Sequence, residues 1–384
     1  MSEPILNPTL NLARQLAGQF AIRADQADRK GELPPEDVRA LVESGYLTLS
    51  IPRVYGGQEL SLRECTAAQL ELAQGSAASA LVAAMQLHVF GSARENRPWP
   101  EAAFERLCRI ATDGGLINAV ASEPALGSPS RGGAFATTAA PHPDGWRING
   151  QKTWITGGKH LTHLLVKLNI EDDPAAVLVP NHAPGVVWIE TWRQSLSLRA
   201  SDSHDVCFDD VIVPFDHLLE RGAHPERPPD AWFVILVASV YLGAALAARD
   251  AVIAYALERV PTALGRPIAT LPGIQRQIGE IDLALQNARS FLLEAAAGWG
   301  GDAESRRRWF PRIVAAKVLA TETAASVTEK ALRIAGGAGI THALPLERFF
   351  RDTRAGLMHP PSGDGALEMI GKHAIEQAKG NADG

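Results

Sequence analysis

Two histidines and two residues of a central motif have the side chains that acid–base and redox chemistry require. His88 and His359 carry imidazoles, which change protonation near neutral pH and can move or hold a proton. Either could instead be structural, His88 in a core helix and His359 in a surface cap. Trp154 and Thr156 combine an aromatic wall with a hydroxyl donor, which suits a flat aromatic cofactor with a polar edge. Trp154 taken alone would be read as a core residue.

Small residues at two places permit close approach of the backbone to a ligand. Ser122 and Ser128 lie on a predicted loop with Gly127, and a glycine there lets the backbone approach a bound group. Gly336 and Gly337 stand at a predicted helix end, where backbone amides can meet a phosphate. The same two glycines could also form an ordinary helix C-cap.

Composition indicates an ordinary globular chain and argues against several classes of protein. The 384 residues carry a formal net charge of −6, with 46% hydrophobic and 21% charged side chains. No basic stretch favours binding to nucleic acid or a membrane surface. Cys65, Cys108 and Cys207 are odd in number and widely spaced, so they predict neither a disulfide framework nor a metal site. The N-terminus has no signal-peptide pattern, so we expect a cytoplasmic protein.

One apolar stretch requires a choice between a membrane span and a buried helix. Residues 231–248 carry no charge and reach the lower length limit for a span. They are rich in alanine and glycine, and they continue into Arg249, Asp250 and further helical pattern up to Arg259. We therefore expect a buried helix in a helical bundle and no membrane association.

The chain changes character twice, which predicts three domains and an α+β fold. Residues 1–114 have helical periodicity and form a predicted N-terminal helical domain. Residues 115–221 contain short strands separated by turn residues, which is typical of a small β barrel or sandwich. A loop rich in proline and charge then leads to residues 231–384, where long alanine-rich helices predict a four-helix bundle.

Local signals predict where some elements begin or reverse. Ser61, with Glu64 three residues later, has the pattern of a capping box at a helix start. Pro-Asp-Gly at 143–145 and Asn-Gly at 149–150 are turn signals, so each predicts a reversal of the chain between strands.

Five segments, in order along the chain, resemble the acyl-CoA dehydrogenase superfamily. They are IPRVYGG at 51–57, SEPALGS at 122–128, INGQKTWIT at 148–156, VCFDDVIVP at 206–214, and GGAG at 336–339 continuing to an Arg-Asp pair at 351–352. Each segment alone is a weak signal. Their order matches the predicted domains, and on this basis the chain is identified as a member of that superfamily.

The resemblance implies a flavoenzyme that binds FAD. The positions that match its flavin-contacting motifs are Ser122, Gly127, Ser128, Trp154, Thr156 and Ser362. Gly336 and Gly337 match a segment that reaches the flavin of a neighbouring subunit, as does an arginine matched by Arg259. The resemblance therefore implies a homotetramer or homodimer, with an electron-transfer flavoprotein as redox partner.

Three positions depart from the family's pattern. Arg333 replaces the usual glutamine before the glycine pair, and Pro129 replaces the aspartate after the loop serine. The third departure concerns catalysis. In this family a glutamate, nine residues after the arginine of the Arg-Asp pair, removes the substrate α-proton while hydride passes to flavin. Counting on from Arg351 places Pro360 at the glutamate position.

Proline at that position removes two functions together. Pro360 has no carboxylate to act as base and no N–H to donate to the substrate oxygen. Other members carry the glutamate at the start of the first bundle helix, which matches residues 231–233 here and again holds no carboxylate. Asp230 and Asp364 are the nearest substitutes, although Asp364 more simply caps the last helix.

The two histidines suggest a second chemistry. The region of His359 resembles a histidine motif of the superfamily's flavin-dependent monooxygenases, and His88 matches a helix that lines the substrate cavity. Those enzymes receive reduced flavin, here expected to be FMN, from a flavin reductase and react it with oxygen.

The sequence thus predicts a flavin-dependent oxidoreductase that acts on an acyl-CoA or acyl-thioester-like small molecule with a displaced base. One alternative is a two-component monooxygenase that uses His88 and His359. The other is a flavin-binding protein without redox chemistry of its own.

Overall fold

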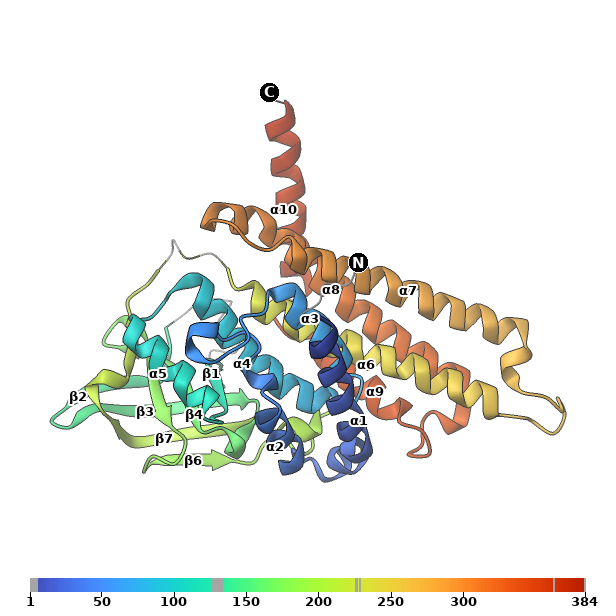
Figure 1. Ribbon diagram of the computed structural model, residues 1–384, viewed down its shortest axis with the longest axis horizontal. Coiled ribbons are helices and arrows are strands. Elements are labelled where there is room, and N and C mark those ends of the chain that lie inside the picture. Colours follow the sequence, from blue (N-terminus) through green and yellow to red (C-terminus); the bar gives the residue numbers. More distant parts are fainter. Residues whose placement is uncertain (1–5, 126–133, 225–226, 228, 362, 383–384) are drawn as a thin grey trace.

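A β sheet forms one end of the protein, long helices form the other, and the N-terminal helices lie between them (Figure 1). The computed structural model describes residues 6–125, 134–224, 227, 229–361 and 363–382. The N-terminal helices are α1 (Leu6–Lys30), α2 (Pro35–Glu43), α3 (Leu62–Leu72), α4 (Ala77–Asn96) and α5 (Glu101–Thr112). The C-terminal helices are α6 (Ala231–Glu258), α7 (Pro272–Ala297), α8 (Ala303–Ala335), α9 (Leu346–Arg354) and α10 (Gly363–Ala382).

Helix starts follow the local chemistry of the sequence. The Ser61 side chain accepts a hydrogen bond from the Glu64 amide, and the Glu64 carboxylate accepts one from the Ser61 amide at 2.8 Å. The predicted capping box at the start of α3 is therefore confirmed. Helix α2 begins with Pro35, whose missing N–H would have had no partner in the first turn.

The middle of the chain forms one mixed sheet. Its strands are β1 (Ile117–Val120), β2 (Thr138–His142), β3 (Gly145–Ile155), β4 (His163–Ile170), β5 (Asp173–Pro180), β6 (Val186–Ile189), β7 (His204–Val213) and β8 (Leu218–Arg221). The strand order is β6-β7-β3-β2-β4-β5-β8, with β1 paired in parallel to β4. The predicted turn at 143–145 is confirmed as the β2–β3 hairpin, in which His142 pairs with Gly145.

The turn predicted at Asn149-Gly150 is wrong. Strand β3 continues through both residues, and its register against β7 shifts between Ile148 and Gly150, which makes a bulge. A Cβ at Gly150 would lie 2.6 Å from Thr137 Cα, so this glycine serves a close approach of two strands. The Asn149 side chain donates to Asp210 Oδ1 and accepts from the Asp210 amide, both at 2.9 Å. Cross-strand pairing therefore overrides the local turn signal.

Helix α6 is the core helix of the C-terminal part. Among the described residues it is the one helix long and apolar enough to cross a membrane, and 89% of its apolar window is buried inside the protein. It packs against α3, α4, α7, α8 and α9. A helix buried on several sides is what the sequence predicts for residues 231–248, a buried helix in a bundle.

The contact between α4 and α6 leaves no room for a side chain at Gly91. A Cβ at Gly91 would lie 2.2 Å from the Trp232 ring, and Trp232 is itself 1% exposed. We expect Gly91→Ala to lower the free energy of unfolding by about 1–3 kcal/mol through overpacking. Chemical denaturation measures this.

Gly18→Ala is the matched control, because Gly18 also lies inside a helix but a Cβ there meets nothing within 4 Å. It should leave stability unchanged or raise it by up to about 1 kcal/mol. Equal stability of the two variants would show that the close contact at Gly91 is not tight.

Candidate active site

Three elements bring His88 and His359 to one place. His88 lies on α4, Phe233 lies in the first turn of α6, and His359 follows the short turn after α9. The His88 ring stands edge-on to Phe233 with centroids 5.3 Å apart, and the His359 ring stands edge-on to Phe233 at 6.2 Å. These residues, with Asp230, Tyr241 and Lys317, are called the histidine cluster below.

Asp230 ties the start of α6 to His88. Its Oδ1 accepts hydrogen bonds from the amides of Trp232 at 2.9 Å and Phe233 at 3.3 Å, so it is the N-cap of α6. Its Oδ2 lies 3.5 Å from His88 Nδ1, too long for a strong hydrogen bond but close enough for an ion pair once His88 is protonated. The N-cap therefore also supplies a carboxylate to the cluster.

His359 is held on its other side by two buried residues. A hydrogen bond of 2.8 Å joins its Nδ1 to Tyr241 Oη, and the Tyr241 side chain is fully buried on α6. Lys317 of α8 donates from Nζ to the carbonyl oxygens of Gly356 at 3.0 Å and His359 at 2.8 Å. Burial, and then the charge of Lys317, lower the pKa of His359 to about 4. Burial likewise lowers the pKa of Lys317 to about 8.

The other catalytic candidate lies outside this cluster. Asp364 falls in the first turn of α10, one residue after the start of that helix, and is exposed. In the part of the chain that the structure describes, Asp364 contacts no member of the histidine cluster. Pro360 follows His359 directly and is partly buried. Ser362, predicted to contact flavin, lies outside the described residues.

Trp154 presents its ring to the outside of the sheet. Its backbone adopts φ = 61°, a left-handed conformation that is strained for an aromatic residue. The indole is 54% exposed, so the alternative of a core aromatic residue is wrong. Strain maintained at an exposed aromatic residue is typical of a ligand wall.

Thr156 lies beside a buried acceptor that lacks a donor. Its hydroxyl bonds to Ser203 Oγ at 2.9 Å, and its carbonyl accepts from Asn118 Nδ2 at 3.0 Å. Asn118 is 3% exposed, and its Oδ1 has no partner among the described residues. An orphaned acceptor, a hydroxyl and an open indole face together fit a flat ring that has one N–H and several hydrogen-bond acceptors along its polar edge, as a flavin has.

A buried ion pair anchors the loop that carries Ser122. Lys152 Nζ lies 2.7 Å from Glu123 Oε1, with exposed side-chain fractions of 0% and 2%. The Glu123 carboxylate also accepts from the amides of Ala136 and Thr137 at 2.8 and 3.0 Å. Burial alone would raise the pKa of Glu123, but the hydrogen bonds from Lys152 and these amides lower it overall. Both ends of the loop are thus fixed against β3, while Gly127 and Ser128 lie outside the described residues.

Helix α4 connects the two groups of residues. A methyl group at Gly157, next to Thr156, would lie 3.8 Å from Val82 on α4. His88 follows Val82 on the same helix after a rise of about 9 Å. Helix α4 therefore carries His88 and also lies close to the end of the Trp154–Thr156 motif.

Arg259, Gly336 and Gly337 lie apart from this region. Arg259 ends α6 and the glycines follow α8, and both helix ends point away from the sheet (Figure 1). All three residues are exposed. Their predicted contact with a flavin therefore requires a second subunit and stays a prediction.

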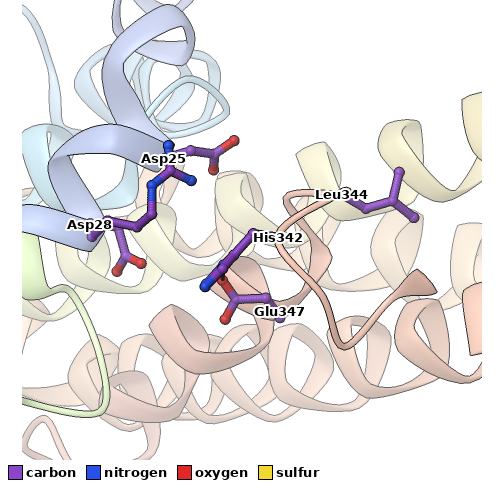
Figure 2. A pocket seen from close by; sticks show the side chains of 6 residues that line it. Asp25, Asp28, His342, Leu344 and Glu347 are labelled. Atoms are coloured by element: carbon purple, nitrogen blue, oxygen red, sulfur yellow. Dashed lines mark hydrogen bonds and ion pairs between the residues drawn. The ribbon is translucent and has the colours of Figure 1, made fainter. Parts of the chain in front are cut away.

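A polar depression lies between α1 and the segment that leads into α9 (Figure 2). Its lining residues are Asp25, Asp28, Arg29, His342, Leu344 and Glu347. Asp25 pairs with Arg348, Asp28 pairs with Arg351, and Glu347 contacts both Arg351 and His342. These partners satisfy the carboxylates, so the depression is a structural contact between α1 and α9.

Family models match all three parts of the chain. The acyl-CoA dehydrogenase N-terminal, middle and C-terminal domains match residues 10–99, 118–211 and 235–361. The putative acyl-CoA dehydrogenase YdbM of Bacillus subtilis is 34% identical over 365 residues, which cover 94% of this chain and 95% of YdbM.

Solved structures of two kinds share the fold. KijD3 in complex with FMN and a dTDP-amino-keto sugar superposes with a TM-score of 0.85 at 25% identity, covering 98% of this chain and 95% of KijD3. Butyryl-CoA dehydrogenase from Megasphaera elsdenii superposes with a TM-score of 0.85 at 23% identity, covering 98% of this chain and 99% of that enzyme.

The fold and these matches define an enzyme with a helical domain, a β domain and a helical bundle. The chain belongs to the acyl-CoA dehydrogenase family. The predicted family and fold class are confirmed.

Sequence reasoning missed several residues of the candidate site. Tyr241, Lys317 and Asn118 were not predicted, and Glu123 and Lys152 were seen only as parts of motifs. Lys317 had a usable signal, because it follows Ile313 by four residues and therefore lies on the apolar face of α8. Asn118 had none, because an isolated asparagine in a strand is uninformative.

Removal of the cation from the buried pair should be costly. Lys152→Met leaves the Glu123 carboxylate buried without its counter-ion, so we expect a loss of about 3–5 kcal/mol in the free energy of unfolding. Glu123→Gln added to Lys152→Met should recover part of the loss, because no buried charge then remains. Chemical denaturation of the three proteins measures both steps.

Lys330→Met is the matched control, because Lys330 pairs with Glu280 at 3.0 Å with both side chains about 40% exposed. Its removal should cost at most about 1 kcal/mol. Equal losses for the two lysines would contradict the importance of the buried pair.

The depressed pKa of His359 predicts a pH dependence of stability. Its pKa is about 4 in the folded protein, against an ordinary 6.5. As pH falls from 6.5 to 4, the unfolded chain therefore takes up a proton that the folded chain does not, and stability falls. His359→Gln lacks this proton uptake, so its stability should fall less over the same window in urea titrations.

His182→Gln, at an exposed histidine, should keep the wild-type pH dependence. A His359→Gln protein that follows the wild-type curve would show that His359 is not held neutral.

Proposed function

We propose that the chain is a flavin-dependent oxidoreductase in which the histidine cluster replaces the family's catalytic glutamate, and that it is a two-component monooxygenase. The observation that carries the proposal is the approach of His88 and His359 to one aromatic ring, Phe233. Among the described residues, the carboxylate that lies within ion-pair distance of His88 belongs to Asp230, which also caps α6.

The proposed flavin site uses the residues whose geometry fits the cofactor. Trp154 provides an open aromatic face, Thr156 a hydroxyl, and Asn118 an unpaired acceptor. FMN is the expected cofactor of a two-component enzyme, and FAD is expected if the enzyme dehydrogenates. Reduced flavin, when bound, supplies the electrons for oxygen activation and transfer of one oxygen atom to substrate.

Residues of the histidine cluster have separate proposed roles in proton transfer and in the exclusion of water. His88 lies beside Asp230 and is the histidine that we assign to accept a proton from the substrate or return one. Phe233 and Tyr241 cover the region with aromatic surface, which excludes water and strengthens polar contacts within it. A flavin reductase is the proposed source of electrons, and a homo-oligomer would bring Arg259, Gly336 and Gly337 to the flavin.

A second function is favoured by the position of Asp230. Its Oδ2 is not used in the N-cap, and the Asp230 side chain is 37% exposed. The Asp230–His88 pair could therefore serve as a displaced base for α-proton removal from an acyl thioester. The similarity to the putative acyl-CoA dehydrogenase YdbM supports this reading.

Two measurements on the purified protein separate these functions. Under the proposal, oxygen reoxidises photoreduced FMN more slowly in the presence of the protein than in free solution. The absorbance of oxidised flavin measures the rate. Anaerobic addition of a panel of straight-chain acyl-CoAs should leave bound oxidised flavin unbleached. Bleaching by any acyl-CoA would instead support dehydrogenation, and absence of both responses would favour a flavin-binding protein without chemistry.

Variants then locate the proton transfer. His88→Gln should lower the rate of product formation by roughly 10²–10⁴-fold without loss of flavin, because a positioned general acid–base contributes that much. His182→Gln is the exposed control and should retain the wild-type rate. An unchanged rate in His88→Gln would remove His88 from the mechanism.

A further inference from the structure

The two nitrogens of His359 have different surroundings. Nδ1 bonds to Tyr241 Oη at 2.8 Å, on a side closed by the fully buried tyrosine. Nε2 makes no hydrogen bond with the described residues, and it is not among the fully covered side-chain atoms that lack a partner. Nε2 is therefore the ring nitrogen that remains accessible to a bound molecule.

The hydrogen bond with Tyr241 defines which nitrogen carries the proton. Tyr241 Oη has no other hydrogen-bond partner in the described part of the chain. If Nδ1 were protonated, it would donate to Tyr241, and the buried tyrosine O–H would be left without an acceptor. Leaving a buried donor unsatisfied costs more than a typical hydrogen bond gains. Tyr241 therefore donates to Nδ1, and the proton of the neutral ring is on Nε2.

Lys317 keeps the ring from gaining a second proton. Its side chain is 2% exposed, and among the described residues no carboxylate forms an ion pair with it, although the charge of Glu322 acts to raise its pKa. Lys317 Nζ instead donates to the carbonyl oxygens of Gly356 and His359, which places a positive charge at the backbone of the histidine. Both burial and this charge disfavour imidazolium, in line with the lowered pKa of His359.

The other charged groups around His359 support the same state. From α6, Tyr241 has a raised pKa, first because of burial and then because of Asp352 on α9, so it stays a donor. From α4, His88 contacts Phe233 and shares no hydrogen bond with His359. Among the described residues, no carboxylate forms a hydrogen bond or ion pair with His359, and the one charge that shifts its pKa is the positive charge of Lys317.

We infer that His359 is a fixed hydrogen-bond donor and not an acid or base, with Tyr241 and Lys317 as the positioning residues that hold it as the neutral Nε2–H tautomer. The Nε2–H then offers, one residue before Pro360, the donor that proline itself cannot offer. The use of this donor in turnover rests on the proposed function. The tautomer of His359 and its structural origin are independent of that function.

Long-range ¹H–¹⁵N spectra of the full-length protein with labelled histidine test the tautomer directly, without flavin or substrate. His359→Gln identifies the signal by its disappearance. We expect an unprotonated Nδ1 and a protonated Nε2 that persist from pH 8 down to about pH 5. A Nδ1–H tautomer, or titration near pH 6.5, would overturn the inference whether or not the enzyme is a monooxygenase.

Variants of the two positioning residues test the cause. Lys317→Met should move the titration of His359 upward toward 6.5, and Tyr241→Phe should give a mixture of tautomers. Lys330→Met removes an exposed lysine from the same helix and should change neither property. A His359 titration unchanged in Lys317→Met would show that the lysine does not hold the ring neutral.

Measurement of kcat tests the donor role of His359 independently once a substrate is known. His359→Gln keeps an N–H donor and should retain more of kcat than His359→Phe, which keeps only the aromatic ring. Loss of one such donor typically lowers kcat by roughly 10²–10³-fold. Equal kcat values for the two variants would contradict a donor role, even if the spectra confirm the tautomer.

Discussion

The burial of α6 on several sides is the constraint on which the rest of the site depends. A helix that packs against five others has little freedom to shift along or rotate about its axis. Its N-cap Asp230 and first-turn Phe233 meet His88, and Tyr241, about two turns later, meets His359. One rigid element therefore sets the positions of both histidines, although His88 on α4 and His359 after α9 are far apart in the sequence.

In the proposed site, groups whose charge is controlled by burial take the place of the family's carboxylate. Lys317 is a buried cation paired with carbonyl oxygens, and it stabilises a neutral imidazole next to it. Asp230 keeps one oxygen for the helix and directs the other toward His88. The two histidines thus have different electrostatic surroundings, which is how one site can contain a proton carrier and a fixed donor.

The predictions that succeeded depend on contacts between residues close in the sequence, and those that failed depend on contacts between distant residues. The capping box of Ser61 and Glu64 is local, since both residues lie within one turn of helix, and it formed as predicted. Asn149-Gly150 has an equally clear local signal, but strand pairing with β7 and contact with Thr137 turned it into a bulge. The core reading of Trp154 also failed, since its indole is 54% exposed on a strand whose backbone is left-handed at this residue.

The sequence by itself determined the family and the order of helical, β and helical parts, and it holds Pro360 where the resemblance implies a glutamate. These properties follow from motif identity, periodicity and the chemistry of single residues, none of which needs long-range contacts. Only the tertiary structure decided that His88 and His359 meet at Phe233, that Asp230 lies beside His88, and that Tyr241 and Lys317 support His359. Protonation state and tautomer depend on burial and on neighbours from other helices, and folding alone brings those neighbours together.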